Sequence, residues 1–189
     1  DDRKTPVHQT DARTFIQRCP QAYDVVVVDL FHGDGTPDYL LTRDFFRDLR
    51  GCLAQGGIAV FNTFADLENT RSYAHLLATL RAELPNLALF RPNTAGVTHT
   101  NSFIVASVTP LRNPARITMD GMPPRHESNL WDMLAAPLSL SVGLFEGGQI
   151  ITDARNHGAL DIAHAQRVYR QTDRKSTRLN SSHLVISYA

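Results

Sequence analysis

One short apolar run constrains this chain more than any other feature. Residues 24–29 are Asp-Val-Val-Val-Val-Asp, and the four valines favour an extended backbone. A strand with no polar position is typical of the inner strands of a parallel sheet, which are buried on both faces. We therefore predict an α/β fold with Asp29 at the carboxyl end of a central strand. Ligands bind at that end of open α/β sheets, so Asp29 is the first candidate for chemistry.

The composition is that of an ordinary soluble domain and argues against several classes of partner. The chain has 189 residues and a hydrophobic share of 42%, which suit a single domain. Its formal net charge is zero, so no overall field attracts nucleic acid or an anionic membrane, and we expect neither partner. No apolar run approaches the roughly 20 residues that span a bilayer. We expect a cytoplasmic protein, with a true N-terminus that precedes Asp1.

Cysteines and histidines give no sign of a metal or redox site. Cys19 and Cys52 lie outside any metal-ligand spacing or redox motif, and we predict two small buried residues without a disulfide. The histidines show no ligand spacing, so no metal is expected.

Hydrophobic periodicity predicts strands that alternate with helices. Asp11 and Thr42 are the predicted helix N-caps, and Gly56-Gly57 is expected to close the helix that Thr42 begins. In chain order we predict a strand over 6–10, a helix over 12–18, a strand over 24–29, a helix over 43–53, a strand over 58–62, a helix over 67–84, strands over 87–90 and 102–108, a short helix near 130–134, an extended piece over 149–152 and a last helix over 159–170.

The order of these elements predicts a mostly parallel sheet with helices on both faces. The last two strands are joined by a polar segment without a helical pattern, so we expect them to pair antiparallel at an edge, as a hairpin. The loop over 29–42 contains two glycines and a proline among acids. Such a loop is either a plain surface loop with solvated acids or a place where backbone approaches a ligand. Its position after the apolar strand favours a binding site.

The stretch over 23–62 resembles the spermidine synthase family of aminopropyltransferases and its spermidine synthase-like relatives. That family has the class I S-adenosylmethionine-dependent methyltransferase fold, which is Rossmann-like. Its pattern is a hydrophobic strand, Asp-Ser-Thr-Asp-Pro-x-Gly-Pro, and then Leu-Phe-Thr-x-x-Phe. Asp29 falls on the first family Asp and Gly35 on the family Gly, without a gap. Leu40-Leu41-Thr42 with Phe45 falls on the second motif.

Two further segments support the resemblance. Gln9-Thr10-Asp11-Ala12-Arg13 is similar to the family's Gly-Asp-Ala segment, whose Asp contacts the adenine amino group. Ile151-Thr152-Asp153 is similar to a Thr-Asp-Asp sequence before the last helix of spermidine synthase-like chains.

The resemblance implies a site and a cofactor. S-adenosylmethionine or its decarboxylated form would be a substrate, with a small-molecule acceptor and a homodimer as the assembly. His32 stands where the family has its second Asp, and imidazole is a poor anchor for an ammonium group, so polyamine specificity is not expected. The implied roles are catalytic for Asp29, cofactor-binding for Asp11, Ala12 and Leu30, and substrate-binding for His32, Asp34 and Gly35.

By the same resemblance, this chain is a fragment truncated at its N-terminus. The Gly-rich loop and the ribose-binding acid of the fold would precede Asp1, so we expect residues 1–110 to be the C-terminal part of a nucleotide-binding domain. Residues 111–172 are then a C-terminal extension packed on it. Residues 173–189 resemble a translated sequencing adapter and are expected to be a disordered, non-native tail.

Two other functions stay open from sequence. One is a methyltransferase of the same fold, in which Asp29 orients the acceptor. The other is a non-catalytic binding module. We expect the fragment itself to be inactive and to bind S-adenosylmethionine weakly or not at all.

Overall fold

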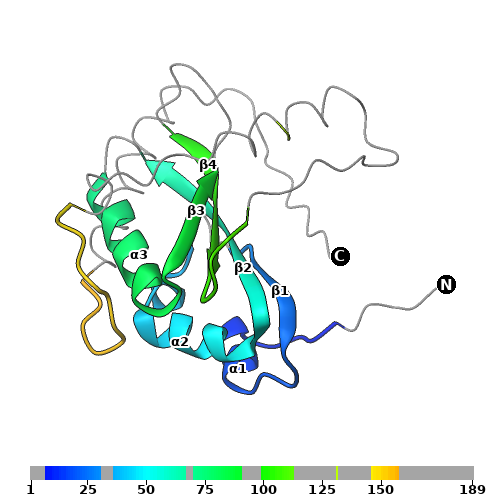
Figure 1. Cartoon of the computed structure of the whole chain (residues 1–189). Helices are drawn as coiled ribbons and strands as arrows, with labels where there is room; N and C mark the ends of the chain where they lie inside the picture. The colour runs from blue at the N-terminus through cyan, green and yellow to red at the C-terminus, as the bar shows by residue number, and fades with distance from the viewer. Residues whose placement is uncertain are drawn as a thin grey trace, which may run out of the picture.

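The computed structural model describes residues 7–30, 36–66, 70–90, 99–112, 131 and 146–157. Strands and helices alternate through most of this part of the chain (Figure 1), as predicted. In order, the elements are α1 (Ala12–Gln17), β1 (Tyr23–Val28), the 3₁₀ helix η1 (Asp38–Leu40), α2 (Arg43–Cys52), β2 (Leu53–Asp66), α3 (Thr70–Glu83), β3 (Asn86–Phe90) and β4 (His99–Ser107).

Four strands form one mixed sheet in the order β1-β2-β4-β3. β1 and β2 are parallel, whereas β4 is antiparallel to both β2 and β3. Three strands therefore share one direction and β4 opposes them. This arrangement confirms the mostly parallel α/β sheet with an antiparallel pair at its edge.

Both predicted helix caps are present. The Asp11 side chain accepts a hydrogen bond from the backbone N–H of Thr14, and the Thr42 side chain accepts one from Phe45. Such bonds satisfy N–H groups that have no partner within the helix. They explain why α1 and α2 begin at the predicted residues.

The core is a single apolar cluster between the helices and one face of the sheet. Helices α1, α2 and α3 all contribute to it, and Figure 1 shows them gathered on the same side of the strands. The described helices thus cover one face. The prediction of helices on the opposite face is not tested by the described residues. Among the largest fully buried side chains are Phe45, Phe46, Leu49, Phe61, Leu77, Leu80, Leu84 and Ile104.

β1 is not buried on both faces, which corrects the first prediction. Val25 and Val27 are 52% and 65% exposed, whereas Val28 is 6% exposed. β1 is the edge strand of the described sheet, and alternate residues of a strand point to opposite faces. The valine run therefore has one face that packs on the core and one that is open.

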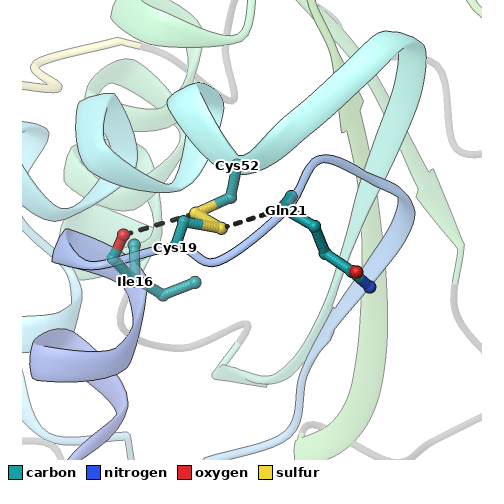
Figure 2. The surroundings of a disulfide bond; sticks show 4 residues. All are labelled: Ile16, Cys19, Gln21 and Cys52. Atoms are coloured by element: carbon teal, nitrogen blue, oxygen red, sulfur yellow. Dashed lines mark hydrogen bonds between the residues drawn. A yellow bond between two sulfur atoms is a disulfide. The ribbon is translucent and has the colours of Figure 1, made fainter.

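A disulfide joins Cys19 to Cys52, contrary to the sequence prediction (Figure 2). It connects the segment just after α1 to the last residue of α2. The two Cα atoms lie 5.7 Å apart, within the usual range for a disulfide. The Sγ of Cys19 also lies 3.2 Å from the carbonyl oxygen of Gln21, and the Sγ of Cys52 lies 3.3 Å from that of Ile16.

Gly56 and Gly57 lie inside β2 and do not close α2, which ends at Cys52. The register shifts here, because Tyr23 faces Leu53 but Val25 faces Ile58. Gly56 has a φ of 80°, and a Cβ at Gly57 would lie 2.9 Å from the Tyr23 carbonyl oxygen. The two glycines thus permit a bulge at which the backbones of β1 and β2 come close together.

The remaining sequence predictions fall into two groups. Residues 7–10 have no strand, so the predicted strand over 6–10 is wrong over its described part. The short helix near 130–134, the helix over 159–170 and the tail over 173–189 lie outside the described residues, apart from residue 131. Within the described part of the chain, no helix is long and apolar enough to cross a membrane.

Candidate functional site

Asp29 follows the last residue of β1, at the carboxyl end of the parallel pair. The register pairs Val28 with Phe61, so the next residues of the two strands, Asp29 and Asn62, emerge side by side. The Asn62 amide donates a hydrogen bond of 3.0 Å from Nδ2 to Oδ1 of Asp29. Asp29 is exposed. Its carboxylate is therefore held through one oxygen, and the other has no hydrogen-bond partner among the described residues.

Asp11 occupies the N-cap of α1 and not the end of a strand. Its Oδ1 accepts the Thr14 backbone N–H at 3.0 Å, and its Oδ2 accepts the Tyr39 hydroxyl at 3.1 Å. The hydrogen bond from the Thr14 backbone, followed by that from Tyr39, lowers the pKa of Asp11 below its usual value. An ionised carboxylate has about four lone-pair sites, so Asp11 can still accept an amine from a ligand.

Tyr39 joins Asp11 to the loop that follows β1. It belongs to η1, and its backbone carbonyl accepts a hydrogen bond of 3.0 Å from Nη1 of Arg13. Burial, and then the hydrogen bond to Asp11, raises the pKa of Tyr39, so the phenol stays protonated and donates. The Tyr39 side chain thus links Asp11, the predicted adenine contact, to the segment that follows β1.

A segment far along the chain, residues 149–157, forms an ion pair and hydrogen bonds with the same region. Its Asp153 pairs with Arg13 and accepts a hydrogen bond of 2.7 Å from the Thr42 hydroxyl. The Asn156 amide donates to the Asp38 carboxylate at 3.2 Å. Figure 1 shows this segment, in yellow, beside α2 and α3. The similarity of 151–153 to the family sequence thus falls on residues that contact the predicted site.

Of the other predicted site residues, the structure describes Ala12 and Leu30. Ala12 is the first residue of α1 and is half-buried. Leu30 packs against the core cluster, so a ligand contact there would use its backbone. His32, Asp34 and Gly35 lie outside the described residues. In the described part of the chain, no group of three metal-ligating side chains occurs.

Sequence reasoning missed the contacts that connect these groups. Tyr39, Arg13 and Asp153 come from three separate parts of the chain, and no local pattern predicts that they meet. The only signal was the short similarity at 151–153. No hydrogen bond within the described residues joins Asp29 directly to Asp11.

Known proteins are similar to the part of the chain that carries Asp11 and Asp29. A family model for the spermine/spermidine synthase domain matches residues 1–91, which include Asp11 and Asp29. Over those residues, the chain is similar to the spermine/spermidine synthase domain. The match ends at the close of β3, so it includes β1, β2 and the described helices α1, α2 and α3.

Individual relatives cover only part of the chain and of their own length. A polyamine aminopropyltransferase from Vibrio vulnificus is 34% identical over 113 residues, which is 58% of this chain and 36% of the relative. An N-terminal histidine N-methyltransferase from Emericella nidulans is 32% identical over 99 residues, which is 50% of this chain and 17% of the relative. The chain therefore spans about a third or less of the length of these two relatives.

A solved structure of a probable spermidine synthase from Corynebacterium glutamicum is also similar. It aligns with a TM-score of 0.49 and 26% sequence identity, and the alignment covers 55% of this chain and 38% of that chain.

Proposed function

We propose that the protein to which this chain belongs transfers an aminopropyl group from decarboxylated S-adenosylmethionine to a small amine, with Asp29 as the base. The observation that carries this proposal is the exposed Asp29 carboxylate beside Asn62, at the carboxyl end of β1 within the family match. Polyamine aminopropyltransferases are among the relatives of that segment.

In this reaction the acceptor nitrogen attacks the carbon next to the sulfonium. A carbon–nitrogen bond forms, the carbon–sulfur bond breaks, and its electron pair returns to sulfur, which leaves as a neutral thioether. The acceptor amine must be unprotonated to attack, and its nitrogen releases a proton. A carboxylate within hydrogen-bond reach can hold the amine and take that proton. Because the sulfonium is a good leaving group, most of the remaining catalysis is alignment of the two reactants.

The environment of Asp29 suits such a base. Asn62 donates to one carboxylate oxygen and thereby restrains the carboxylate without adding charge. The second oxygen can then accept the acceptor amine. Asp11, held by Thr14 and Tyr39, is the proposed acceptor for the adenine amino group.

We define the acceptor by its chemistry as a small primary amine. His32 replaces the second family Asp in the sequence, and a neutral imidazole does not neutralise an ammonium group. For this reason the proposal does not assign a diamine or polyamine as the acceptor.

Methyl transfer is the second candidate, because an N-methyltransferase is among the relatives. There Asp29 would orient the acceptor nitrogen, and the cofactor would keep its carboxylate.

A non-catalytic module is the third candidate. Supplying the longer protein with each cofactor form and a set of amines distinguishes them by the mass added to the acceptor.

We expect Asp29→Asn to lower turnover by about a hundredfold or more, as expected when a general base is removed. Asp24→Asn is the matched control, since Asp24 is an exposed aspartate of the same strand at its other end. It should leave turnover unchanged. A loss of less than about threefold for Asp29→Asn would remove Asp29 from the mechanism, because a general base contributes far more than this.

A further inference from the structure

Asp153 bonds to three partners on two other elements. Its Oδ2 pairs with Nη2 of Arg13, which extends from α1, and its Oδ1 accepts the hydroxyl of Thr42, the N-cap of α2, at 2.7 Å. Its backbone N–H donates to Oδ2 of Asp44 at 2.9 Å. Burial alone would raise the pKa of Asp153, but the hydrogen bonds from Arg13 and Thr42 outweigh burial and lower it.

The segment around Asp153 is anchored independently of these bonds. Ile151 is 4% exposed, and its backbone N–H donates to the Thr79 hydroxyl at 3.0 Å. Its carbonyl accepts the Arg43 backbone N–H at 2.7 Å. The Gln149 N–H donates to Nδ1 of His75 at 2.8 Å. Asp153 is therefore presented from a fixed backbone.

A chain of contacts runs from Asp153 to Asp11. The Arg13 guanidinium that pairs with Asp153 also donates from Nη1 to the Tyr39 carbonyl at 3.0 Å. The Tyr39 hydroxyl in turn donates to Oδ2 of Asp11 at 3.1 Å. An arginine has five N–H donors in a rigid planar fork, so fixing one nitrogen also fixes the direction of the other.

We propose that Asp153 is a positioning residue for the adenine-contacting carboxylate: it orients Arg13, which holds Tyr39 so that the phenol donates to one oxygen of Asp11. The ligand class is an adenine nucleoside, and this part of the inference rests on the proposed function. The coupling itself is a property of the chain and does not require group transfer.

The alternative is an ordinary surface ion pair. The Asp153 side chain is 43% exposed, and exposed pairs contribute little to stability. Such a pair would affect only its own partners. A positioning residue would also change the ionisation of Asp11, which Asp153 does not touch.

The test is a titration of the Asp11 carboxyl by carbon-13 NMR in the full 189-residue chain. Asp153→Asn is compared with Asp48→Asn. Asp48 and Asp153 both act on Arg13 through their charge, but only Asp153 forms a hydrogen bond with it. Removing either negative charge can only lower the pKa of Asp11 or leave it unchanged. Loss of the Tyr39 hydroxyl from Asp11 raises that pKa, so the two effects have opposite signs.

We expect Asp153→Asn to raise the pKa of Asp11 and Asp48→Asn not to raise it. Tyr39→Phe should produce a rise at least as large, and adding Asp153→Asn to Tyr39→Phe should produce no further rise. If Asp153→Asn leaves the pKa unchanged or lowers it, or if it adds to Tyr39→Phe, the proposal is overturned.

Arg13→Lys provides a second variant if Asp153→Asn fails to fold. It keeps the charge but loses the planar fork, so it should also raise the pKa of Asp11. An unchanged pKa there would equally overturn the coupling. Because this readout needs no turnover, its failure is distinguishable from failure of the proposed transferase activity.

Discussion

Glu83, a buried residue at the end of α3, forms ion pairs with two arginines of α2. Its side chain is 3% exposed and accepts Nε of Arg43 at 2.7 Å and Nη1 of Arg50 at 2.8 Å. Both arginines are about half exposed, at 48% and 44%. One buried carboxylate thus ties the end of α3 to both ends of α2.

Glu83→Gln should lower the free energy of unfolding by about 1–3 kcal/mol, because charge-assisted hydrogen bonds of a buried group are lost. Arg50→Ala should cost less than about 1 kcal/mol, since its charge is half exposed and Arg43 still pairs with Glu83. Urea denaturation of the two variants measures the difference. Equal losses would contradict the view that Glu83 is the shared partner.

The loss of stability in acid should depend on two carboxylates, those of Asp11 and Asp153. Hydrogen bonds lower the pKa of Asp11, and the largest effect is that of the Thr14 backbone. Burial would raise the pKa of Asp153, but its hydrogen bonds outweigh burial and lower that pKa as well. Each group therefore stabilises the fold fully above the pKa it has in the unfolded chain. That stability is lost as the pH falls through the lowered pKa of the folded state.

Unfolding free energies measured by urea between pH 7 and pH 2 should thus decrease below about pH 4. Asp153→Asn should make this decrease shallower. If the variant and the original chain lose stability in parallel, Asp153 does not contribute to acid sensitivity.

At the scale of elements, α1 depends on its neighbours. It has six residues, fewer than an isolated helix needs in water. Ile16 packs in the core, and the bridge between Cys19 and Cys52 fixes the segment after α1 to the end of α2. The orientation of Asp11, at the start of this helix, therefore relies on covalent as well as apolar contacts.

Reduction of the disulfide should lower the free energy of unfolding by about 3–4 kcal/mol, because the bridge restricts a loop of intermediate length in the unfolded chain. Denaturation with and without dithiothreitol measures this. Cys19→Ser is the control, since its stability should equal that of the reduced chain and should not respond to the reductant. A midpoint that the reductant does not change in the original chain would contradict the prediction.

Sequence predicted the elements that are determined locally. Asp11 and Thr42 cap helices through residues three positions away, and the valine run forms β1 as expected. The disulfide was missed because 33 positions separate its cysteines. The contact between Arg13 and Asp153 spans 140 positions, and only the packing of α1, α2 and the segment over 149–157 brings it about.

At the scale of the whole molecule, the sheet has unequal faces. The helices cover the face to which Val28 points, while Val25 and Val27 point to the opposite one. The apolar run alone could not predict this difference, because valine is compatible with either environment. Asp29 was predicted correctly at the end of the strand, since that position depends only on the chain direction.

Matched substitutions in β1 test the two faces. Val28→Thr should destabilise the fold by about 1–3 kcal/mol, because it buries a hydroxyl without a partner. Val27→Thr, at a position that is 65% exposed, should change stability by less than about 0.5 kcal/mol. Thermal and urea denaturation measure both. Comparable losses would mean that something covers the second face.

The sulfur bridge has a mechanical consequence as well. It encloses the stretch from Cys19 to Cys52, which contains β1 and the loop that bears Asp29. A force that stretches the polypeptide from its two ends would pass from one cysteine directly to the other. In the oxidised protein β1 would then bear no tension, and single-molecule pulling would lengthen the chain by the enclosed residues only after reduction.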